Sequence, residues 1–224
     1  MQVKSESKSA LGNVVVIDDD ASVRRSLCTL LERAGYVVSL HESADDFLKN
    51  PVLPIPAVVV LDMRMPGTSG VALQSQLKTL SESAAVVFVS GDSRPEEIIA
   101  AMKQGAVDFL LKPFNAQAML DVVQKAMRVA EQLAMQSKKQ LKVSERLERL
   151  TPRELEICHW MVRGYSNQQI ASLDGAAAAT IKLHRARVMD KMSAQSLPEL
   201  IDMLSDMDLP VPAGAIKSVP APVA

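Results

Sequence analysis

Short apolar runs alternate with amphipathic helical patterns from Asn13 to about Met127. The runs predict five β-strands, at Val14–Ile17, Val37–Leu40, Ala57–Leu61, Ala85–Val89 and Asp108–Leu110. Between the strands, and after the last one, apolar residues recur at helical spacing. Strict alternation of strands and helices is typical of a parallel sheet with helices on both faces. The pattern therefore predicts an α/β domain.

Glycine and proline mark where the predicted helices begin and end. Gly35 follows the first apolar stripe, in the position of a left-handed C-cap, and the stretch PVLPIP closes the second helix, Ala44–Lys49. Pro95 suits the first turn of the fourth helix, which we expect to end at Gly105. The third helix is predicted from apolar residues at helical spacing: Val71, Leu73, Leu77 and Leu80.

The rest of the chain is predicted to be helical. A helix that begins near Asn115 meets no Gly or Pro through Arg149, and its charged second half predicts a helical or partly flexible linker. From Leu150 to about Met207 there is no β-rich run, which indicates an all-helical domain. We therefore expect a disordered N-terminus (1–12), an α/β domain (13–127), a linker (128–149), an all-α domain (150–207) and a disordered Pro- and Ala-rich tail (208–224).

Composition narrows the class of protein. The chain has 224 residues, of which 48% are hydrophobic, enough for two packed cores. Its 25 basic and 26 acidic residues nearly cancel, so nucleic-acid binding requires cations segregated on one surface. Cys28 and Cys158 lie far apart within helical patterns, which is neither a disulfide nor a metal-ligand spacing. No apolar segment is long enough to span a membrane, so we expect a soluble, cytoplasmic protein without membrane contact.

Carboxylates follow two of the predicted strands. Asp18, Asp19 and Asp20 come after VVVI, and Asp62 comes after AVVVL. Because the carboxyl ends of parallel strands line the ligand crevice of such a sheet, we expect these acids to lie together. Clustered carboxylates repel one another, and Mg²⁺ suits carboxylates combined with phosphate oxygens. We interpret Asp20 as the N-cap of the first helix rather than as a ligand.

A hydroxyl group and an ammonium group follow two further strands. Ser90 ends the fourth strand and Lys112 ends the fifth. With the acids, they describe a phosphoryl-transfer site: Asp62 is the nucleophile, Mg²⁺ and Lys112 neutralise the phosphoryl oxygens, and Ser90 bonds the attached group. The Lys112–Pro113 bond is a candidate cis peptide that would aim the lysine inward.

The all-helical segment begins with a strong helix-start signal. Thr151 is expected to be an N-cap, Pro152 suits the first turn, and Glu154 completes a capping box. The buried face of this helix is expected to comprise Leu155, Cys158, His159 and Val162. A short helix from Asn167 to about Leu173 and a turn, DGAAAA, come next.

The helix after this turn carries the segregated positive charge. The outward residues are expected to be Lys182, Arg185, Arg187 and Lys191. The inner face is expected to comprise Ile181, Val188 and Met192, with either Leu183 or His184. A cationic helix preceded by a shorter helix and a tight turn is the helix-turn-helix plan, in which the second helix enters the major groove of DNA.

Four segments resemble, in order, the signatures of response-regulator receiver domains: VVVIDDDASVRR, VVVLDMRMPGTSG, VFVSGD and GAVDFLLKPF. The resemblance covers about Asn13 to Met127 and implies a flavodoxin-like sheet in the order 2-1-3-4-5. It also implies that a sensor histidine kinase phosphorylates Asp62. The implied Mg²⁺ ligands are Asp18, Asp19, Asp62 and the Arg64 carbonyl, and the implied phosphoryl-contacting or switch residues are Ser90, Lys112 and Phe109.

The string TPRE…G.SN..IA…TIK.HR..VM.KM resembles the LuxR-type DNA-binding domain over about Leu150 to Met207. Combined with a receiver, it is typical of the NarL/FixJ class, on the FixJ side. Lys182 and Leu183 would approach base edges, whereas cations further along would hold phosphates. The implied DNA-binding set is Thr180, Lys182, Leu183, Arg185, Arg187 and Lys191. The implied partners are the kinase, promoter DNA and a second phosphorylated copy of the chain, and RNA polymerase is a partner that the resemblance allows.

Two positions depart from the LuxR-type pattern and leave alternatives open. Relatives usually have Leu at Asp174, which would put a charge toward the core, and Ser or Thr at Ala177, which forgoes a cap worth roughly 1 kcal/mol. Asp174 would cap an earlier helix start if the turn is reorganised. One alternative function is a phosphoryl-switched protein-interaction module with impaired DNA binding. Another is a phosphatase-type enzyme; because no second acid/base or substrate pocket is found, we expect no enzyme.

Overall fold

The computed structural model describes residues 10–81, 83–91, 94–205 and 207. It divides the chain into two compact units, Met1–Ser137 and Lys138–Ala224, called here the first and second units. Of the segments predicted to be disordered, 1–9 and 208–224 lie outside the described residues. Leu11 and Gly12 are hydrogen-bonded to Gly35 and Val37, so the packed chain begins slightly before the predicted start at 13.

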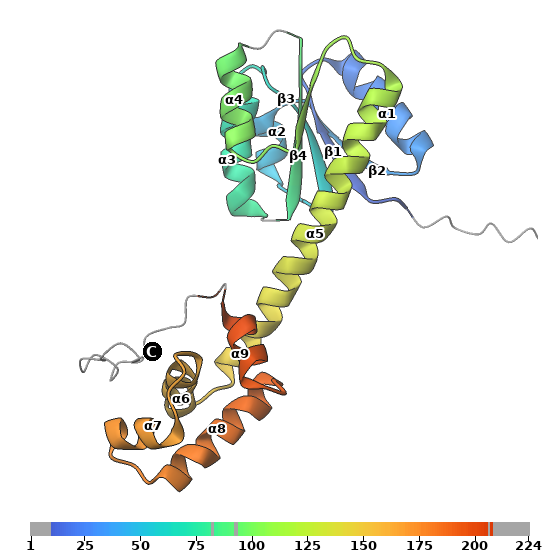
Figure 1. The fold of residues 1–224 in the computed structure, drawn as a ribbon. Helices are drawn as coiled ribbons and strands as arrows, with labels where there is room; N and C mark the ends of the chain where they lie inside the picture. Colours follow the sequence, from blue (N-terminus) through green and yellow to red (C-terminus); the bar gives the residue numbers. More distant parts are fainter. Residues whose placement is uncertain (1–9, 82, 92–93, 206, 208–224) are drawn as a thin grey trace, which may run out of the picture. The chain divides into compact units, whose positions relative to one another are not determined.

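The first unit contains a five-stranded, all-parallel sheet in the order β2-β1-β3-β4-β5, as predicted (Figure 1). Each strand is one or two residues longer than the apolar runs indicated. The strands are β1 (Asn13–Ile17), β2 (Val37–His41), β3 (Ala57–Asp62), β4 (Ala84–Ser90) and β5 (Asp108–Leu111). They alternate with α1 (Ala21–Ala34), α2 (Ala44–Lys49), α3 (Gly70–Leu80), α4 (Pro95–Lys103) and α5 (Ala116–Glu148).

Helices cover both faces of this sheet, because neighbouring residues of each strand point to opposite sides. Val14 and Val16 of β1 pack in one core with residues of α1 and α5, whereas Val15 and Ile17 pack in a second core with residues of α2, α3 and α4. Every residue of β3 is buried. Continuous apolar strands are expected in a parallel sheet that is covered on both faces.

Local signals set the helix ends as the sequence predicts. The Asp20 carboxylate accepts hydrogen bonds from the backbone N–H groups of Ser22 and Val23 at 2.7 and 3.3 Å, which confirms it as the N-cap of α1. Gly35 ends α1 in the left-handed conformation, with φ of 101°. The Lys112–Pro113 peptide bond is cis, as the sequence analysis proposed.

Helix α5 contributes to the cores of both units. Met119, Val123 and Ala130 are buried in the first unit, and Val143 is buried in the second. The residues between them are helical without interruption. The predicted linker, 128–149, is therefore helical through residue 148, and its two ends belong to packed cores.

The second unit consists of the end of α5 and α6 (Pro152–Val162), α7 (Asn167–Asp174), α8 (Ala178–Met192) and α9 (Leu197–Leu204). Thr151 caps α6, and the predicted capping box with Glu154 is present. The expected buried face of α6 was partly wrong: Ile157 and Met161 are buried with Cys158 and His159, whereas the expected Leu155 and Val162 are only partly buried. Within the described part of the chain, no helix is both long and apolar enough to cross a membrane.

Candidate functional site

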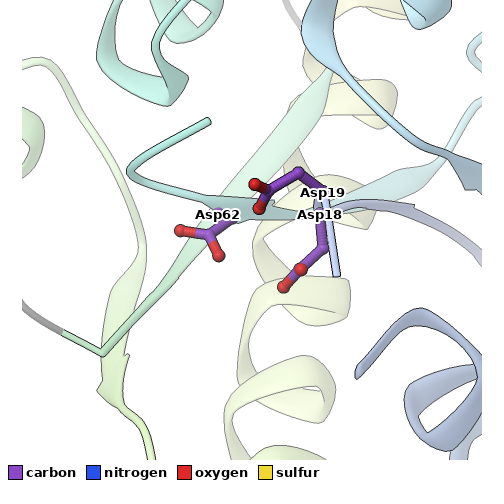
Figure 2. A group of neighbouring side chains, drawn as sticks. All are labelled: Asp18, Asp19 and Asp62. Carbon is purple, nitrogen blue, oxygen red and sulfur yellow. The ribbon is translucent and has the colours of Figure 1, made fainter. Parts of the chain in front are cut away.

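Three acidic residues meet where β1 and β3 end (Figure 2). One carboxylate oxygen each from Asp18, Asp19 and Asp62 lies within 4.8 Å of the others. Asp18 and Asp62 are buried, and Asp19 is exposed. The two strands are hydrogen-bonded neighbours, with Ile17 opposite Leu61, so the residues that follow them must lie close together. The structure thus brings together the three acids that the sequence placed at strand ends.

Lys112, which follows β5, bridges two of these acids. Its Nζ atom donates to Asp18 Oδ2 at 2.7 Å and to Asp62 Oδ2 at 2.6 Å. Burial alone would lower the pKa of the ammonium group, but the hydrogen bonds to the two carboxylates outweigh it and raise that pKa. Burial raises the pKa of Asp18, against the lowering effect of its bonds from Lys112 and from the backbone of Asp20. Lys112 thus pairs with Asp18 and Asp62, and the Arg24 guanidinium donates to the Asp18 carbonyl at 2.5 Å.

Hydrogen bonds join Asp62 to the loop that follows it, and they join the end of β4 to Lys112. Asp62 Oδ1 accepts a hydrogen bond from the Arg64 backbone N–H at 3.0 Å. On the neighbouring strand, Ser90 is buried at the end of β4, and its carbonyl accepts a bond from the Lys112 N–H at 2.7 Å. Ser90 and Lys112 therefore lie at the ends of two adjacent strands, β4 and β5, at the same edge of the sheet as Asp62 at the end of β3. Phe109 is partly buried on β5, against the second core.

Gly70 is a residue of this site that the sequence analysis missed. It begins α3, and its Cα lies against the end of β3: an added Cβ would overlap the Asp62 carbonyl oxygen and lie 3.1 Å from Met63 Cα. Only a residue without a side chain allows this approach. The sequence signal for this close approach was the glycine in TSG, which comes just before an apolar helical stripe.

The expected cations of α8 fall into two groups. Lys182 and Arg187 are exposed, and so is Leu183, at 52%. Arg185 and Lys191 are only partly exposed, because each contacts its own unit. Arg185 Nη1 donates to the Tyr165 carbonyl at 2.9 Å. The expectation that all four cations of α8 project outward was therefore wrong for Arg185 and Lys191.

Lys191 pairs with a buried carboxylate. Its Nζ atom donates to Glu154 Oε2 at 2.5 Å and to the Arg149 carbonyl at 3.1 Å. The bond from Lys191, followed by bonds from Thr151, lowers the pKa of Glu154 to about 2. The capping carboxylate of α6 thereby also holds the end of α8, a contact across 37 residues that the capping box alone did not indicate.

An open groove lies between the starts of α7 and α8. Its volume is about 460 Å³, and it is lined by Ser166, Asn167, Gln168, Ala178, Ala179 and Lys182. The inner face of α8 is formed by Ile181, Val188 and Met192. The sequence did not decide whether Leu183 or His184 belongs to this inner face. His184 does, since its Nδ1 atom is buried, whereas Leu183 is exposed. This face packs α8 against its unit and leaves the start of the helix accessible.

Comparison with known proteins identifies both units. The first matches the response regulator receiver domain over residues 14–124, and the second matches the luxR family of bacterial regulatory proteins over residues 148–204. Transcriptional regulatory protein FixJ of Azorhizobium caulinodans is 38% identical over 85% of this chain and 90% of that protein. The chain belongs to the NarL/FixJ class of response regulators.

Other relatives match this response regulator over most of its length. The tetrathionate response regulatory protein TtrR of Salmonella typhimurium is 34% identical over 89% of this chain and 95% of that protein. The solved structure of response regulator StyR covers 87% of this chain and 98% of its own, with a TM-score of 0.70 and 36% identity. Full-length FixJ from B. japonicum gives a TM-score of 0.54 at 36% identity and covers 88% and 97%. The response regulator thus combines a receiver with a DNA-binding helix-turn-helix domain and regulates transcription under the control of phosphorylation.

The atypical turn of this response regulator is accommodated without a buried charge. Asp174 is the last residue of α7, and its carboxylate pairs with the Arg153 guanidinium of α6. Gly175 ends α7 in the left-handed conformation, and α8 begins after Ala177 without a side-chain cap. The expectations that Asp174 places a charge toward the core or caps α8 were therefore wrong, because Arg153 reaches it at the surface.

Ala177→Ser is expected to stabilise the second unit. Ala177 already has N-cap backbone angles, φ of −70° and ψ of 139°, but its side chain cannot accept a hydrogen bond. A serine there gains roughly 1 kcal/mol of unfolding free energy. Urea unfolding of the full chain, followed by the fluorescence of Trp160, the single tryptophan, measures this effect. Ala179→Ser, inside the same helix, should give no gain, and equal unfolding midpoints for Ala177→Ser and the parent chain would contradict the assigned cap.

Proposed function

We propose that this response regulator accepts a phosphoryl group on Asp62 from a sensor histidine kinase, and that the phosphorylated form binds promoter DNA through α8. The observation that carries the proposal is the position of Asp62. It ends the central strand β3, beside the acid pair, and one of its oxygens lies 2.6 Å from Lys112 Nζ.

The chemistry follows from these groups. An Asp62 oxygen attacks the phosphorus atom of phosphohistidine, so an O–P bond forms as the N–P bond breaks. A carboxylate is already ionised, and no general base is needed. Lys112 neutralises charge on the phosphoryl oxygens, and the Ser90 hydroxyl bonds the attached group. Mg²⁺ suits the hard oxygens of Asp18, Asp19, Asp62 and the Arg64 carbonyl and would neutralise further phosphoryl charge.

We expect the attached phosphoryl group to shift an existing equilibrium between two conformations. Ser90 would move toward the phosphoryl group, and Phe109 would fill the space that it leaves. Dimerisation of the phosphorylated form would follow on the surface of α4, β5 and α5. Three apolar side chains are exposed on α4 and β5 of that surface: Ile99, Met102 and Leu111.

DNA binding is proposed to use the accessible start and outer face of α8. Lys182 lines the groove between α7 and α8, and Thr180, Leu183 and Arg187 are exposed on the same helix. The alternative of an interaction module with impaired DNA binding was suggested by Asp174 and by the alanine run after it; the pairing of Asp174 with Arg153 speaks against the first of these, and the run still leaves α8 without a side-chain cap. We propose that this regulator acts at promoters in the cytoplasm, with RNA polymerase as a further partner, and we propose no enzymatic activity for it.

Substitutions at two exposed cations test the DNA proposal. Lys182→Ala is expected to reduce discrimination between the specific site and mutated sites by roughly 1–3 kcal/mol, the scale of one base contact. Arg187→Ala should instead weaken specific and random DNA about equally and lower the salt slope by about one, as expected for a lost phosphate contact. The measurement is titration of the phosphorylated full chain with an operator selected from random DNA. Unchanged affinity and specificity in Lys182→Ala would contradict the docking of α8 in the groove.

A further inference from the structure

An ion pair joins the loop after Asp62 to the start of α4. The Arg64 Nη2 atom lies 3.2 Å from Glu97 Oε2, and the two side chains are 45% and 38% exposed. Arg64 also donates its backbone N–H to Asp62 Oδ1 at 3.0 Å. Arg64 thus contacts the phosphoacceptor through its backbone and α4 through its side chain.

The Glu97 carboxylate also closes the first turn of α4. Its Oε2 atom, the one that faces Arg64, accepts a hydrogen bond from the Arg94 backbone N–H at 3.1 Å at the start of the helix. The bond from Arg94, followed by the bond from Arg64, holds the pKa of Glu97 below its usual range. One carboxylate oxygen therefore serves both the helix cap and Arg64, and removal of Arg64 changes the surroundings of the α4 start.

We propose that Arg64 leaves Glu97 when Asp62 is phosphorylated and binds the phosphoryl oxygens. This inference rests on the proposed role of Asp62. A phosphoryl group brings a charge of about −1.5 to −2 at neutral pH, which exceeds the single charge of Glu97. The planar fork of the guanidinium matches two phosphoryl oxygens, and the side chain is 45% exposed rather than packed in a core.

The exchange gives Arg64 two functions. It adds a cation to the phosphoryl group, beside Lys112, and it frees Glu97 at the start of α4. Arg64 is therefore a phosphoryl-binding residue whose departure reports phosphorylation to α4, the helix that carries the exposed Ile99 and Met102.

Beryllofluoride, which mimics a phosphoryl group on aspartate, tests the exchange in the full chain. Arg64→Ala is expected to weaken beryllofluoride binding about tenfold, the scale of one charge-assisted hydrogen bond, and Arg64→Lys should restore part of the loss. Glu97→Gln retains a capping side chain but removes the competing charge, so it should strengthen binding about threefold. Lys125→Ala, which removes an exposed ion pair to Asp108 in the same unit, is the matched control and should change nothing.

A second measurement separates phosphoryl binding from general packing. In the parent chain, beryllofluoride should shift the backbone NMR signals of Glu97 and Ile98. In Arg64→Ala without beryllofluoride, these signals should already be displaced in the same direction, because the contact with Glu97 is absent.

Equal beryllofluoride affinity in Arg64→Ala and the parent chain would overturn the inference, as would weaker binding in Glu97→Gln. In both cases labelling of Asp62 in the parent chain would still support the proposed function. If the parent chain neither binds beryllofluoride nor becomes labelled on Asp62, the proposed function itself fails, and the role of Arg64 fails with it.

Discussion

Asp62→Asn is expected to abolish phosphoryl labelling of the chain by a small phosphodonor in the presence of Mg²⁺. Asp62 lies opposite both the acid pair and Lys112, and an amide at this position is not a phosphoryl acceptor. The loss should be complete, because Asp62 is the acid of the cluster that ends the central strand β3, and the other two, Asp18 and Asp19, are proposed to bind Mg²⁺. Phosphate that alkali or hydroxylamine releases from the intact protein, as expected for an acyl phosphate, gives the result.

Asp20→Asn is the matched control for this substitution. Asp20 belongs to the same acidic run, but its carboxylate caps α1. Asparagine caps helices about as well as aspartate, so labelling should persist. Phosphate on another aspartate of Asp62→Asn would show that the phosphoacceptor is assigned to the wrong residue.

The second large effect is expected from Gly70→Ala. The new methyl group would overlap the Asp62 carbonyl oxygen, and the Asp62 carbonyl carbon and Met63 Cα would each lie only 3.1 Å from it. These are backbone atoms of a strand end held between β1 and β4, so either β3 or α3 has to move. We expect a loss of about 3 kcal/mol in unfolding free energy, the upper end for an overpacked site, and a strong loss of labelling on Asp62.

Gly91→Ala provides the comparison for Gly70→Ala. An added Cβ at Gly91 meets its nearest atom, Lys112 Cβ, at 3.9 Å, an ordinary contact. Urea unfolding followed by far-UV circular dichroism should therefore leave Gly91→Ala close to the parent chain. If Gly70→Ala is as stable as Gly91→Ala and is labelled normally, the close approach of α3 to β3 does not constrain the site.

The strand-end chemistry could be predicted from the sequence because it depends on local order. Asp18, Asp62, Ser90 and Lys112 each follow an apolar run, and a parallel sheet brings such ends to one edge. Knowing the strands was enough to place these side chains together, although their phosphoryl roles stay predictions. The first helix could be bounded in the same way, from Asp20 to Gly35.

Contacts between distant surface residues could not be predicted in this way. Arg64 meets Glu97 across 33 positions, and Arg153 meets Asp174 across 21. Long charged side chains have many partners within reach, and no periodic pattern selects one. The apolar residues of α6 allow two overlapping buried faces at helical spacing. Packing against α8 and α9 determines that Ile157 and Met161 are buried.

The complete burial of β3 has a consequence for the timing of the response. A strand paired on both sides and covered on both faces exchanges its amide hydrogens only when the whole unit opens. Asp62, the proposed phosphoacceptor, therefore sits at the end of a segment that we expect to stay closed while the unit is folded. We expect faster motions in the loops and long side chains around it. Asp62 is thus presented on a closed strand, and the proposed conformational shift has to take place in the elements around β3.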